Sequence, residues 1–363
     1  MSGPKPRPWI EKLDVYVGGK SRTDGIAKSV KLSSNESALG ASPMAVAAYL
    51  GEAERLHRYP DAACYDLRAA LAKKYDIDPG QIVCGIGSDE ILKLACRAYL
   101  TPGDEVIFSK HSFMMYPIVT AGFGGVPVEV DDRDFTSDVD NILAAVSEKT
   151  RIIFLANPNN PTGTYIPARE VERLWQNIPG DILLVVDGAY AEFVEKEDYR
   201  PGIELVRKSR NVLMTRTFSK LYGLAALRLG WGYACGEIIA ILDSIRDPFN
   251  VPSVTQVAGI AALRDSDFEE KARAHNREWL NYLTAGLQAI GLYPVPSVTN
   301  FILIRFPEKD GKTAEAANDF LLKRGYILRW LPGQGLHHCL RLTIGTEDQN
   351  RDVLRLLTEF MEQ

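Results

Sequence analysis

The sequence has few cysteines and no cysteine motif. Its five cysteines (Cys64, Cys84, Cys96, Cys235 and Cys339) are scattered over 363 residues, with no C-x-x-C pair and no histidine at metal-ligand spacing. Disulfide frameworks and zinc sites both need ligands at short, regular spacings. The pattern excludes a disulfide-rich scaffold, predicts no metal site, and is typical of reduced cysteines in a reducing compartment.

Long apolar runs and a surplus of basic residues are also missing. No apolar stretch approaches the roughly 18 residues of a membrane-spanning helix, and the start, MSGPKPRPWIEKLD, lacks the apolar core of a signal peptide. Lys and Arg number 42 against 47 Asp and Glu, a formal net charge of −5, whereas nucleic-acid binders usually carry a basic surplus. We therefore expect a cytoplasmic protein that binds neither membranes nor nucleic acid.

What is present is the composition of a globular protein, 46% hydrophobic and 25% charged, long enough for a large domain and a smaller one. After Ser42, helical and strand-like patterns alternate. Short apolar runs that are typical of buried parallel strands occur at residues 106–108, 126–130, 152–155, 182–186 and 212–214. Helix-compatible segments separate several of them, which predicts an α/β domain with a mostly parallel sheet.

The pattern changes after about residue 265. A long helical stretch (268–290) precedes a strand (301–305), a helix (313–323), two more strands (326–329 and 339–344) and a final helix from Glu347. This order predicts a smaller α+β domain. We expect an N-terminal arm (1–40) that joins the small domain, a large domain (41–264) and the small C-terminal domain (265–363).

Polar clusters follow three of the predicted parallel strands. They are N-P-N-N-P-T-G, which contains Asn160, then D-G-A-Y, with Asp187 and Tyr190, and then T-R-T-F-S-K, which ends at Lys220 and has Arg228 eight residues beyond. Each cluster alone is typical of a turn or a helix cap. Because the carboxyl ends of parallel strands share one edge of a sheet, we expect these side chains to converge.

This combination suits the chemistry of pyridoxal phosphate. The cofactor forms an imine with a lysine that has an accessible neutral form, and a buried carboxylate raises the pKa of its ring nitrogen. An amide and a phenol suit its 3′-oxygen. Hydroxyls, an arginine and a helix N-terminus suit its phosphate. The residues therefore predict a pyridoxal-phosphate enzyme.

The same clusters resemble the fold type I aminotransferases. Further stretches are similar, more specifically, to the histidinol-phosphate aminotransferases: Y-V-G-G-K-S, L-S-S-N-E-S, R-Y-P-D, G-S-D-E, H-S-F-M-M-Y and C-L-R-L-T-I-G-T. The resemblance covers nearly the whole chain. It implies the α/β fold of fold type I, in which a large domain with a mostly parallel sheet between helices carries a smaller α+β domain.

The resemblance also implies the roles of the cofactor-binding residues. Lys220 would form the Schiff base and move the substrate proton, and Asp187 would pair with the ring nitrogen. Asn160 and Tyr190 would donate to the 3′-oxygen, and Tyr116 would stack on the ring. The residues expected around the cofactor phosphate are Ser88, Asp89, Thr217, Ser219, Arg228 and, across the interface of a homodimer with shared active sites, Tyr59.

The resemblance implies four substrate-binding residues. Arg341 would grip the α-carboxylate, because a planar guanidinium suits a carboxylate better than an ammonium does, and Asn35 would add a second contact. Tyr16 and Arg329 would contact a distal phosphate. The segment between Arg329 and Arg341 does not align with the family pattern, and its histidine pair, 337–338, is typical of a solvated loop.

The leading hypothesis is an aminotransferase that interconverts histidinol phosphate plus 2-oxoglutarate and imidazole acetol phosphate plus glutamate, in histidine biosynthesis. An aromatic-amino-acid or broad-specificity aminotransferase and a decarboxylase for a phosphorylated amino acid remain alternatives. A cofactor-sensing regulator would need an N-terminal DNA-binding module. Only about 35 residues precede the L-S-S-N-E-S region, which is too few for such a module. The expected partners are therefore a small amino donor and a keto acceptor.

Overall fold

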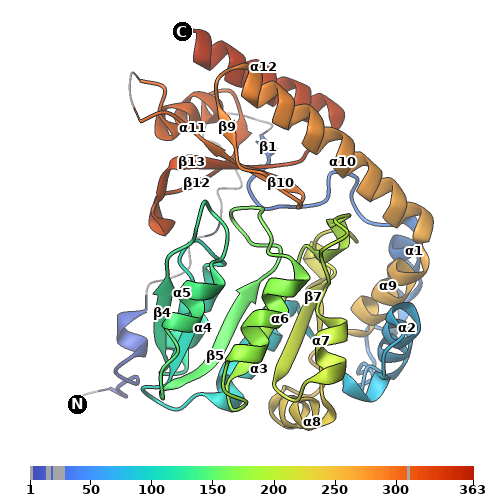
Figure 1. Cartoon of the computed structure of the whole chain (residues 1–363). Helices are drawn as coiled ribbons and strands as arrows, with labels where there is room; N and C mark the ends of the chain where they lie inside the picture. Colours follow the sequence, from blue (N-terminus) through green and yellow to red (C-terminus); the bar gives the residue numbers. More distant parts are fainter. Residues whose placement is uncertain (1–2, 14–17, 19–28, 309–310) are drawn as a thin grey trace.

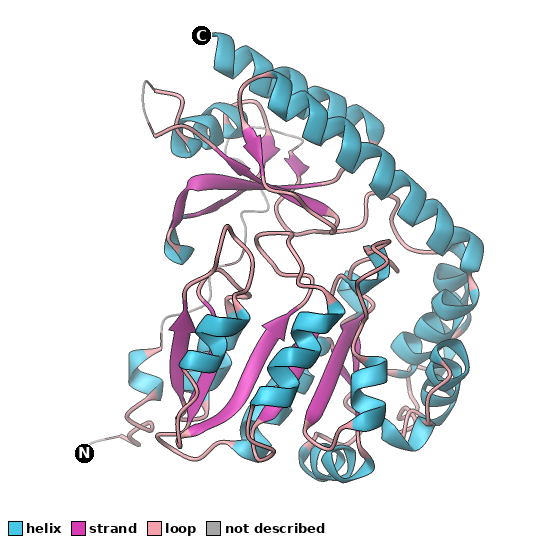
Figure 2. Cartoon of the chain, viewed as in Figure 1, coloured by secondary structure: helices cyan, strands magenta, loops and turns pink. Residues whose placement is uncertain are grey.

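The computed structural model describes residues 3–13, 18, 29–308 and 311–363. In Figure 1 a large sheet with its helices lies beneath a smaller sheet, which is covered by the last helices of the chain. Figure 2, drawn from the same side, shows helices on both faces of the large sheet. Tyr16, predicted to contact a substrate phosphate, lies outside the described residues.

The large sheet has seven strands among the described residues, in the order β2–β8–β7–β6–β5–β3–β4. β8 runs antiparallel to both of its neighbours, and every other neighbouring pair is parallel. The strands are β2 (Ile82–Ile86), β3 (Glu105–Ser109), β4 (Val126–Val130), β5 (Thr150–Ala156), β6 (Leu183–Asp187), β7 (Val212–Thr217) and β8 (Leu229–Ala234). The mostly parallel sheet predicted from the apolar runs is confirmed.

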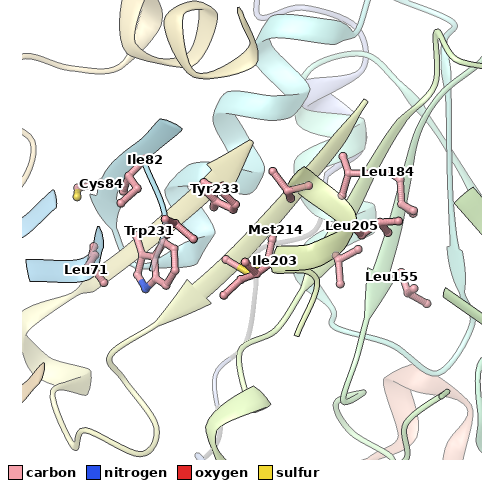
Figure 3. Packing of buried hydrophobic residues seen from close by; sticks show 14 of the residues in the cluster. Leu71, Ile82, Cys84, Leu155, Leu184, Ile203, Leu205, Met214, Trp231 and Tyr233 are labelled. Carbon is pink, nitrogen blue, oxygen red and sulfur yellow. The ribbon is translucent and has the colours of Figure 1, made fainter. Parts of the chain in front are cut away.

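Alternation along the strands divides the core between the two faces of the sheet. Ile153 and Leu155 of β5 pack into one hydrophobic cluster, and Ile152 and Phe154 pack into another. Figure 3 shows part of the first cluster, in which Leu155 lies with side chains of β6, β7 and β8. Both faces are buried, which explains why these strands appear in the sequence as continuous apolar runs.

Helices cover both of these clusters. The first cluster contains side chains of α2 (Tyr65–Tyr75), α5 (Val139–Ala144), α6 (Ala168–Asn177), α7 (Ile203–Lys208) and α9 (Ser253–Arg264). The second contains side chains of α3 (Ser88–Tyr99), α4 (Met115–Gly122) and α8 (Gly236–Ile245). The short helix α1 (Pro43–Gly51) packs on α9. Short 3₁₀ turns lie at Ile10–Lys12, Ala53–Arg55, Pro79–Gln81, Ala191–Phe193, Ala225–Leu227 and Pro332–Gln334.

β8 brings the sheet close to the first turn of α3. A Cβ atom at Gly230 would lie 2.2 Å from the backbone nitrogen of Ser88, so a larger residue would displace the helix start. The strand was missed by the sequence analysis because glycines at 230 and 232 interrupt its apolar pattern. β2, which ends just before the same helix start, was missed as well.

The C-terminal part contains a four-stranded antiparallel sheet in the order β12–β13–β10–β9. Its strands are β9 (Tyr293–Pro294), β10 (Phe301–Arg305), β12 (Arg329–Leu331) and β13 (Leu336–Thr343). Three helices supply its core: α10 (Ser266–Ala289), α11 (Ala314–Leu322) and α12 (Glu347–Glu362). The α+β pattern predicted for this region is present, but the strands predicted at 326–329 and 339–344 are divided differently, because β12 and β13 form a hairpin.

The N-terminal segment joins this C-terminal part. β1 (Val30–Lys31) pairs in parallel with β11 (Tyr326–Ile327), and the backbone N–H of Thr343 donates to the carbonyl of Leu32. The next residues, 33–36, are thereby carried to the edge of β13. Among the described residues no helix combines the length and the apolar character that crossing a membrane requires.

Candidate active site

One cavity of about 280 Å³ lies between the carboxyl edge of the large sheet and the C-terminal part. We call its sheet side the sheet wall: Ser88, Asp89, Asn160, Asp187, Tyr190, Thr217, Ser219, Lys220 and Arg228. We call the opposite side the C-terminal wall: residues 33–36, Arg329, Leu331, Gln334 and Arg341. Thirteen of the fifteen residues predicted for the site line this one cavity, namely these nine with Tyr116, Asn35, Arg329 and Arg341.

Asp187 is the last residue of β6 and is 4% exposed. Its Oδ2 accepts a hydrogen bond from the Tyr116 hydroxyl at 2.9 Å, and its Oδ1 accepts one from the Thr215 hydroxyl at 3.0 Å. Burial raises the pKa of Asp187 to about 6, against the opposing effect of these two hydrogen bonds. A buried carboxyl held by neutral hydroxyls beside a cavity is suited to a cationic group of a ligand.

Lys220 lies three residues beyond the end of β7 and is half-buried. Its Nζ donates to the backbone carbonyl of Ser34 at 3.4 Å and lies 5.6 Å from the centre of the Tyr190 ring. Burial, and then the positive charge of Arg341, lower the pKa of Lys220 to about 8. A substantial fraction of the amine is therefore neutral near physiological pH, as a nucleophilic lysine requires.

An anion-binding corner lies where α3 begins. Arg228 approaches the Ser219 hydroxyl at 3.3 Å and pairs with Asp89 at 3.3 Å, and the Thr217 hydroxyl donates to that of Ser219 at 3.0 Å. A Cβ atom at Gly87, where φ is +74°, would lie 2.6 Å from a guanidinium nitrogen of Arg228, so a larger residue would displace the guanidinium from this position. Hydroxyls, a guanidinium and the start of a 12-residue helix together suit a phosphate group.

Three hydrogen bonds join the two walls. Besides the contact between Lys220 and Ser34, the Asn35 amide donates to the Tyr190 hydroxyl at 2.8 Å, and Arg341 donates to the side-chain oxygen of Asn160. Arg341 also donates to the carbonyl of Ser33 at 2.7 Å. Arg341 and Asn35 of the C-terminal wall therefore each reach the sheet wall, at Asn160 and Tyr190 respectively.

Arg329 and Gln334 enter the cavity from the β12–β13 hairpin. The Gln334 amide donates to the carbonyl of Ser112 at 2.7 Å, which ties the hairpin to the loop before α4. Sequence reasoning predicted Arg329 but missed Gln334, because the segment between Arg329 and Arg341 carries none of the family motifs on which the alignment rested. The hairpin can be recognised only once β12 and β13 are paired.

Tyr116 does not have the surroundings expected of a ring that stacks on a cofactor. It is fully buried. Its ring centre lies 4.7 Å from that of Phe154, in a stacked pair, and 5.7 Å from that of Phe113, in a T-shaped pair. Phe113 also lines the cavity. Its place in the motif H-S-F-M-M-Y was the signal that could have identified it. The geometry favours Phe113 over Tyr116 as the aromatic residue that faces the ligand.

Tyr59 lies outside the cavity. Its ring is 83% exposed and stacks on Phe249 at 4.6 Å. The single chain therefore gives Tyr59 no contact with the anion-binding corner, and the predicted role needs a second subunit.

The family of class I and II aminotransferases matches residues 27–357. The chain belongs to this family, and its architecture is that of the fold type I pyridoxal-phosphate enzymes.

Individual relatives are similar over the whole chain. The histidinol-phosphate aminotransferase of Paramagnetospirillum magneticum is 50% identical, with 99% of each chain covered, and that of Rhodopseudomonas palustris is 49% identical over both full chains. The crystal structure of histidinol-phosphate aminotransferase from Sinorhizobium meliloti in complex with pyridoxal 5′-phosphate superimposes with a TM-score of 0.90 at 31% identity, covering 99% of this chain and 98% of that one. Aspartate aminotransferase from Thermus thermophilus with maleate gives 0.81 at 25% identity, with 92% of each chain covered.

The residues of the cavity fit pyridoxal phosphate, which is the cofactor of this aminotransferase. A buried acid with a raised pKa, a lysine with a lowered pKa and a corner of hydroxyls and guanidinium are the three features that its ring nitrogen, aldehyde and phosphate require. All three features lie on the sheet wall. Their residues lie at or after the ends of β6 and β7, or at the start of α3.

Proposed function

We propose that the protein is a transaminase in histidine biosynthesis. It would interconvert histidinol phosphate plus 2-oxoglutarate and imidazole acetol phosphate plus glutamate. The observation that carries the proposal is that two arginines, Arg329 and Arg341, line the cavity that also holds Lys220. One suits a carboxylate and the other a phosphate. Relatives about 50% identical over the full chain carry the name of this activity.

On the sheet wall, we assign the ring nitrogen to Asp187 and the 3′-oxygen to Asn160 and Tyr190. We assign the face of the ring to Phe113, which also lines the cavity. The phosphate belongs in the corner of Ser88, Asp89, Thr217, Ser219 and Arg228. When bound, the cofactor supplies an electron sink for the negative charge that develops at the substrate α-carbon. Lys220, with its lowered pKa, takes and returns the proton at that carbon.

On the C-terminal wall, Arg341 binds the α-carboxylate of glutamate. Its guanidinium is already oriented by the Ser33 carbonyl and by Asn160, so little rotamer freedom is lost when the carboxylate arrives. Asn35, 1% exposed and anchored through its backbone N–H to the Thr343 hydroxyl at 2.9 Å, lies beside it. Arg329, with Tyr16, is the proposed contact for the distal phosphate of histidinol phosphate.

A homodimer with shared active sites would give Tyr59 a role at the phosphate corner. Large apolar side chains near it in the sequence are also exposed, including Leu50, Leu56 and Tyr65, at 63%, 69% and 74%. Exposed apolar residues that form a contiguous patch on a globular protein mark an interaction surface, which is why we place the subunit interface here. Sedimentation velocity at micromolar concentration should give the mass of a dimer; a monomer that is fully active would contradict this assignment.

The division into an N-terminal arm (1–40), a large domain (41–264) and a small domain (265–363) remains our proposal for the units that move relative to one another. The β1–β11 pairing supports placing the arm with the small domain. A cytoplasmic location is proposed as well, on the strength of the biosynthetic family.

Two experiments test the function. Mixing holoenzyme with glutamate in a stopped-flow cuvette should remove the visible absorbance of the lysine-bound cofactor within one half-reaction; unchanged absorbance would contradict transamination. A substrate panel should then give histidinol phosphate a kcat/KM about 10² to 10⁴ times that for phenylalanine, because phosphate-binding groups left unpaired by the smaller ligand are costly. Equal values would indicate a broad or aromatic aminotransferase instead.

A further inference from the structure

Tyr116 is a buried phenol whose hydroxyl touches the one acid that the cavity buries at the end of β6. Its O–H donates to Oδ2 of Asp187 at 2.9 Å, from α4, an element that carries none of the residues of the two walls. The ring is clamped by Phe154 on β5 and by Phe113. The hydroxyl is therefore held in one place by packing that does not depend on a ligand.

We propose that Tyr116 is a positioning residue that keeps Asp187 ionised and orients its carboxylate toward the ring nitrogen of the cofactor. The inference rests on the cofactor placement proposed above. Thr215 on β7 performs the same task at the other oxygen, Oδ1, at 3.0 Å. With both oxygens tied to donors, the carboxylate plane is fixed before the cofactor binds.

The electrostatic need for such a donor follows from the surroundings of Asp187. Burial favours the neutral acid, and the negative charge of Asp89 on α3 acts in the same direction on the pKa of Asp187. Tyr190 and Tyr199, downstream of β6, are buried phenols that add no positive charge, and Lys220 lies on the same wall with a lowered pKa. Hydrogen bonds from Tyr116 and Thr215 oppose the burial effect. The pKa of Tyr116 itself is raised well above its ordinary value by burial, so the hydroxyl keeps the proton that it donates.

The sign of the effect is definite. Loss of one hydrogen bond to the charged form raises the pKa of Asp187, so the apoenzyme loses its carboxylate at a higher pH. A hydrogen bond to a charged group corresponds to about one pH unit. In the holoenzyme the proton shared with the ring nitrogen should move toward Asp187.

The test compares Tyr116→Phe, which removes only the hydroxyl, with Tyr326→Phe. Tyr326 also donates to an aspartate, Asp352, at 2.9 Å, but in the C-terminal part and away from the cavity. The first measurement is the dissociation constant of pyridoxal phosphate for the apoenzyme from pH 5 to 9. The pH at the midpoint of this dependence should rise by about one unit in Tyr116→Phe and stay unchanged in Tyr326→Phe. The second is the ¹⁵N chemical shift of ring-labelled cofactor, which should move toward the unprotonated value in Tyr116→Phe alone.

Thr215→Val provides an independent variant if Tyr116→Phe does not fold, and it should shift the midpoint in the same direction. An unchanged midpoint and ¹⁵N shift in a folded Tyr116→Phe or Thr215→Val protein would overturn the inference, and so would a shift to lower pH. Neither measurement uses a substrate. Wild-type protein that fails to bind the cofactor would contradict the proposed function, whereas a variant that behaves like wild type would contradict only the role of Tyr116.

Discussion

The two walls of the cavity are built from different kinds of contact. On the sheet wall, Asp187 ends β6, Lys220 follows β7 within three residues, and Ser88 opens α3, so each side chain is placed by a short connection to a rigid element. On the C-terminal wall, Arg341 reaches Ser33 and Asn35 reaches Thr343 across 308 residues of sequence. The first wall is set by the sheet, and the second exists only when two distant segments meet.

This difference suggests a division of labour. A rigid wall is suited to holding a cofactor that stays bound through many turnovers, whereas a wall assembled from an arm and a hairpin is suited to substrates that come and go. Substitutions on the sheet wall should therefore change cofactor binding and the chemical step. Substitutions on the C-terminal wall should change substrate recognition and leave cofactor affinity intact.

The largest effect is expected for Lys220→Ala on the sheet wall. Without the amine, both cofactor attachment and proton transfer are lost, and kcat should fall by about four orders of magnitude or more. The measurement is the single-turnover rate with glutamate. The control is Lys93→Ala, an exposed lysine on α3, which should retain wild-type turnover. More than a tenth of the activity in Lys220→Ala would contradict the assignment.

Asp187→Asn should be the next most severe change. It keeps the size of the side chain but removes the charge that holds the proton on the ring nitrogen, and kcat should fall by about 10² to 10³. Asp198→Asn is a matched control, because Asp198 also accepts a tyrosine hydroxyl, from Tyr165 at 2.8 Å, but is exposed. Equal kcat in the two variants would show that the buried charge is not used.

Arg341→Lys tests the C-terminal wall. Lysine keeps the charge but cannot form two parallel hydrogen bonds to a carboxylate, so kcat/KM for glutamate should fall about 10- to 100-fold. The dissociation constant of the cofactor should stay within about twofold of wild type. Arg305→Lys, at the exposed end of β10 in the same sheet, is the control. A large loss of cofactor affinity in Arg341→Lys would break the separation between the walls.

The sheet wall could be predicted from the sequence better than the C-terminal wall. Asn160, Asp187 and Lys220 were predicted and line one cavity, because each follows an apolar run within a few residues. Gln334 was missed and the hairpin strands were misplaced, because β12 and β13 are defined by pairing with each other, which a local pattern does not record. Tyr16 lies outside the described residues, so its assignment stays a prediction.

Packing, which the sequence does not record, favours Phe113 over the predicted Tyr116 as the ring that faces the ligand. Phe113 and Tyr116 lie three residues apart in one motif, and both are aromatic, so the motif marks both rings as candidates but does not decide which of them faces the ligand. Packing decides it, because β5 supplies Phe154 as a stacking partner for Tyr116 and Asp187 accepts its hydroxyl. β8 was missed because its glycines are required by the approach to α3 and not by the strand itself.

The smallest effect concerns pH. The pKa of Lys220 is lowered to about 8, first by burial and then by the charge of Arg341. Only the neutral form of an amine attacks an aldehyde. The rate at which the cofactor attaches to Lys220 of the apoenzyme should therefore rise with pH, with a midpoint near pH 8, well below the ordinary pKa of lysine. Arg341→Met should raise that midpoint by less than about one unit, since burial remains. A wild-type midpoint above 10 would contradict the effect of burial on Lys220.

The division of labour between the walls is tested most directly by one paired measurement on Ser219→Ala and Arg329→Ala. For each variant, the cofactor dissociation constant and the ratio of kcat/KM for histidinol phosphate to that for phenylalanine are determined together. We predict that Ser219→Ala weakens cofactor binding about tenfold and leaves the ratio unchanged. Arg329→Ala should leave cofactor binding unchanged and lower the ratio about 100-fold. The walls do not have separate functions if Arg329→Ala leaves the kcat/KM ratio unchanged. The same conclusion follows if each variant changes both the cofactor dissociation constant and the kcat/KM ratio.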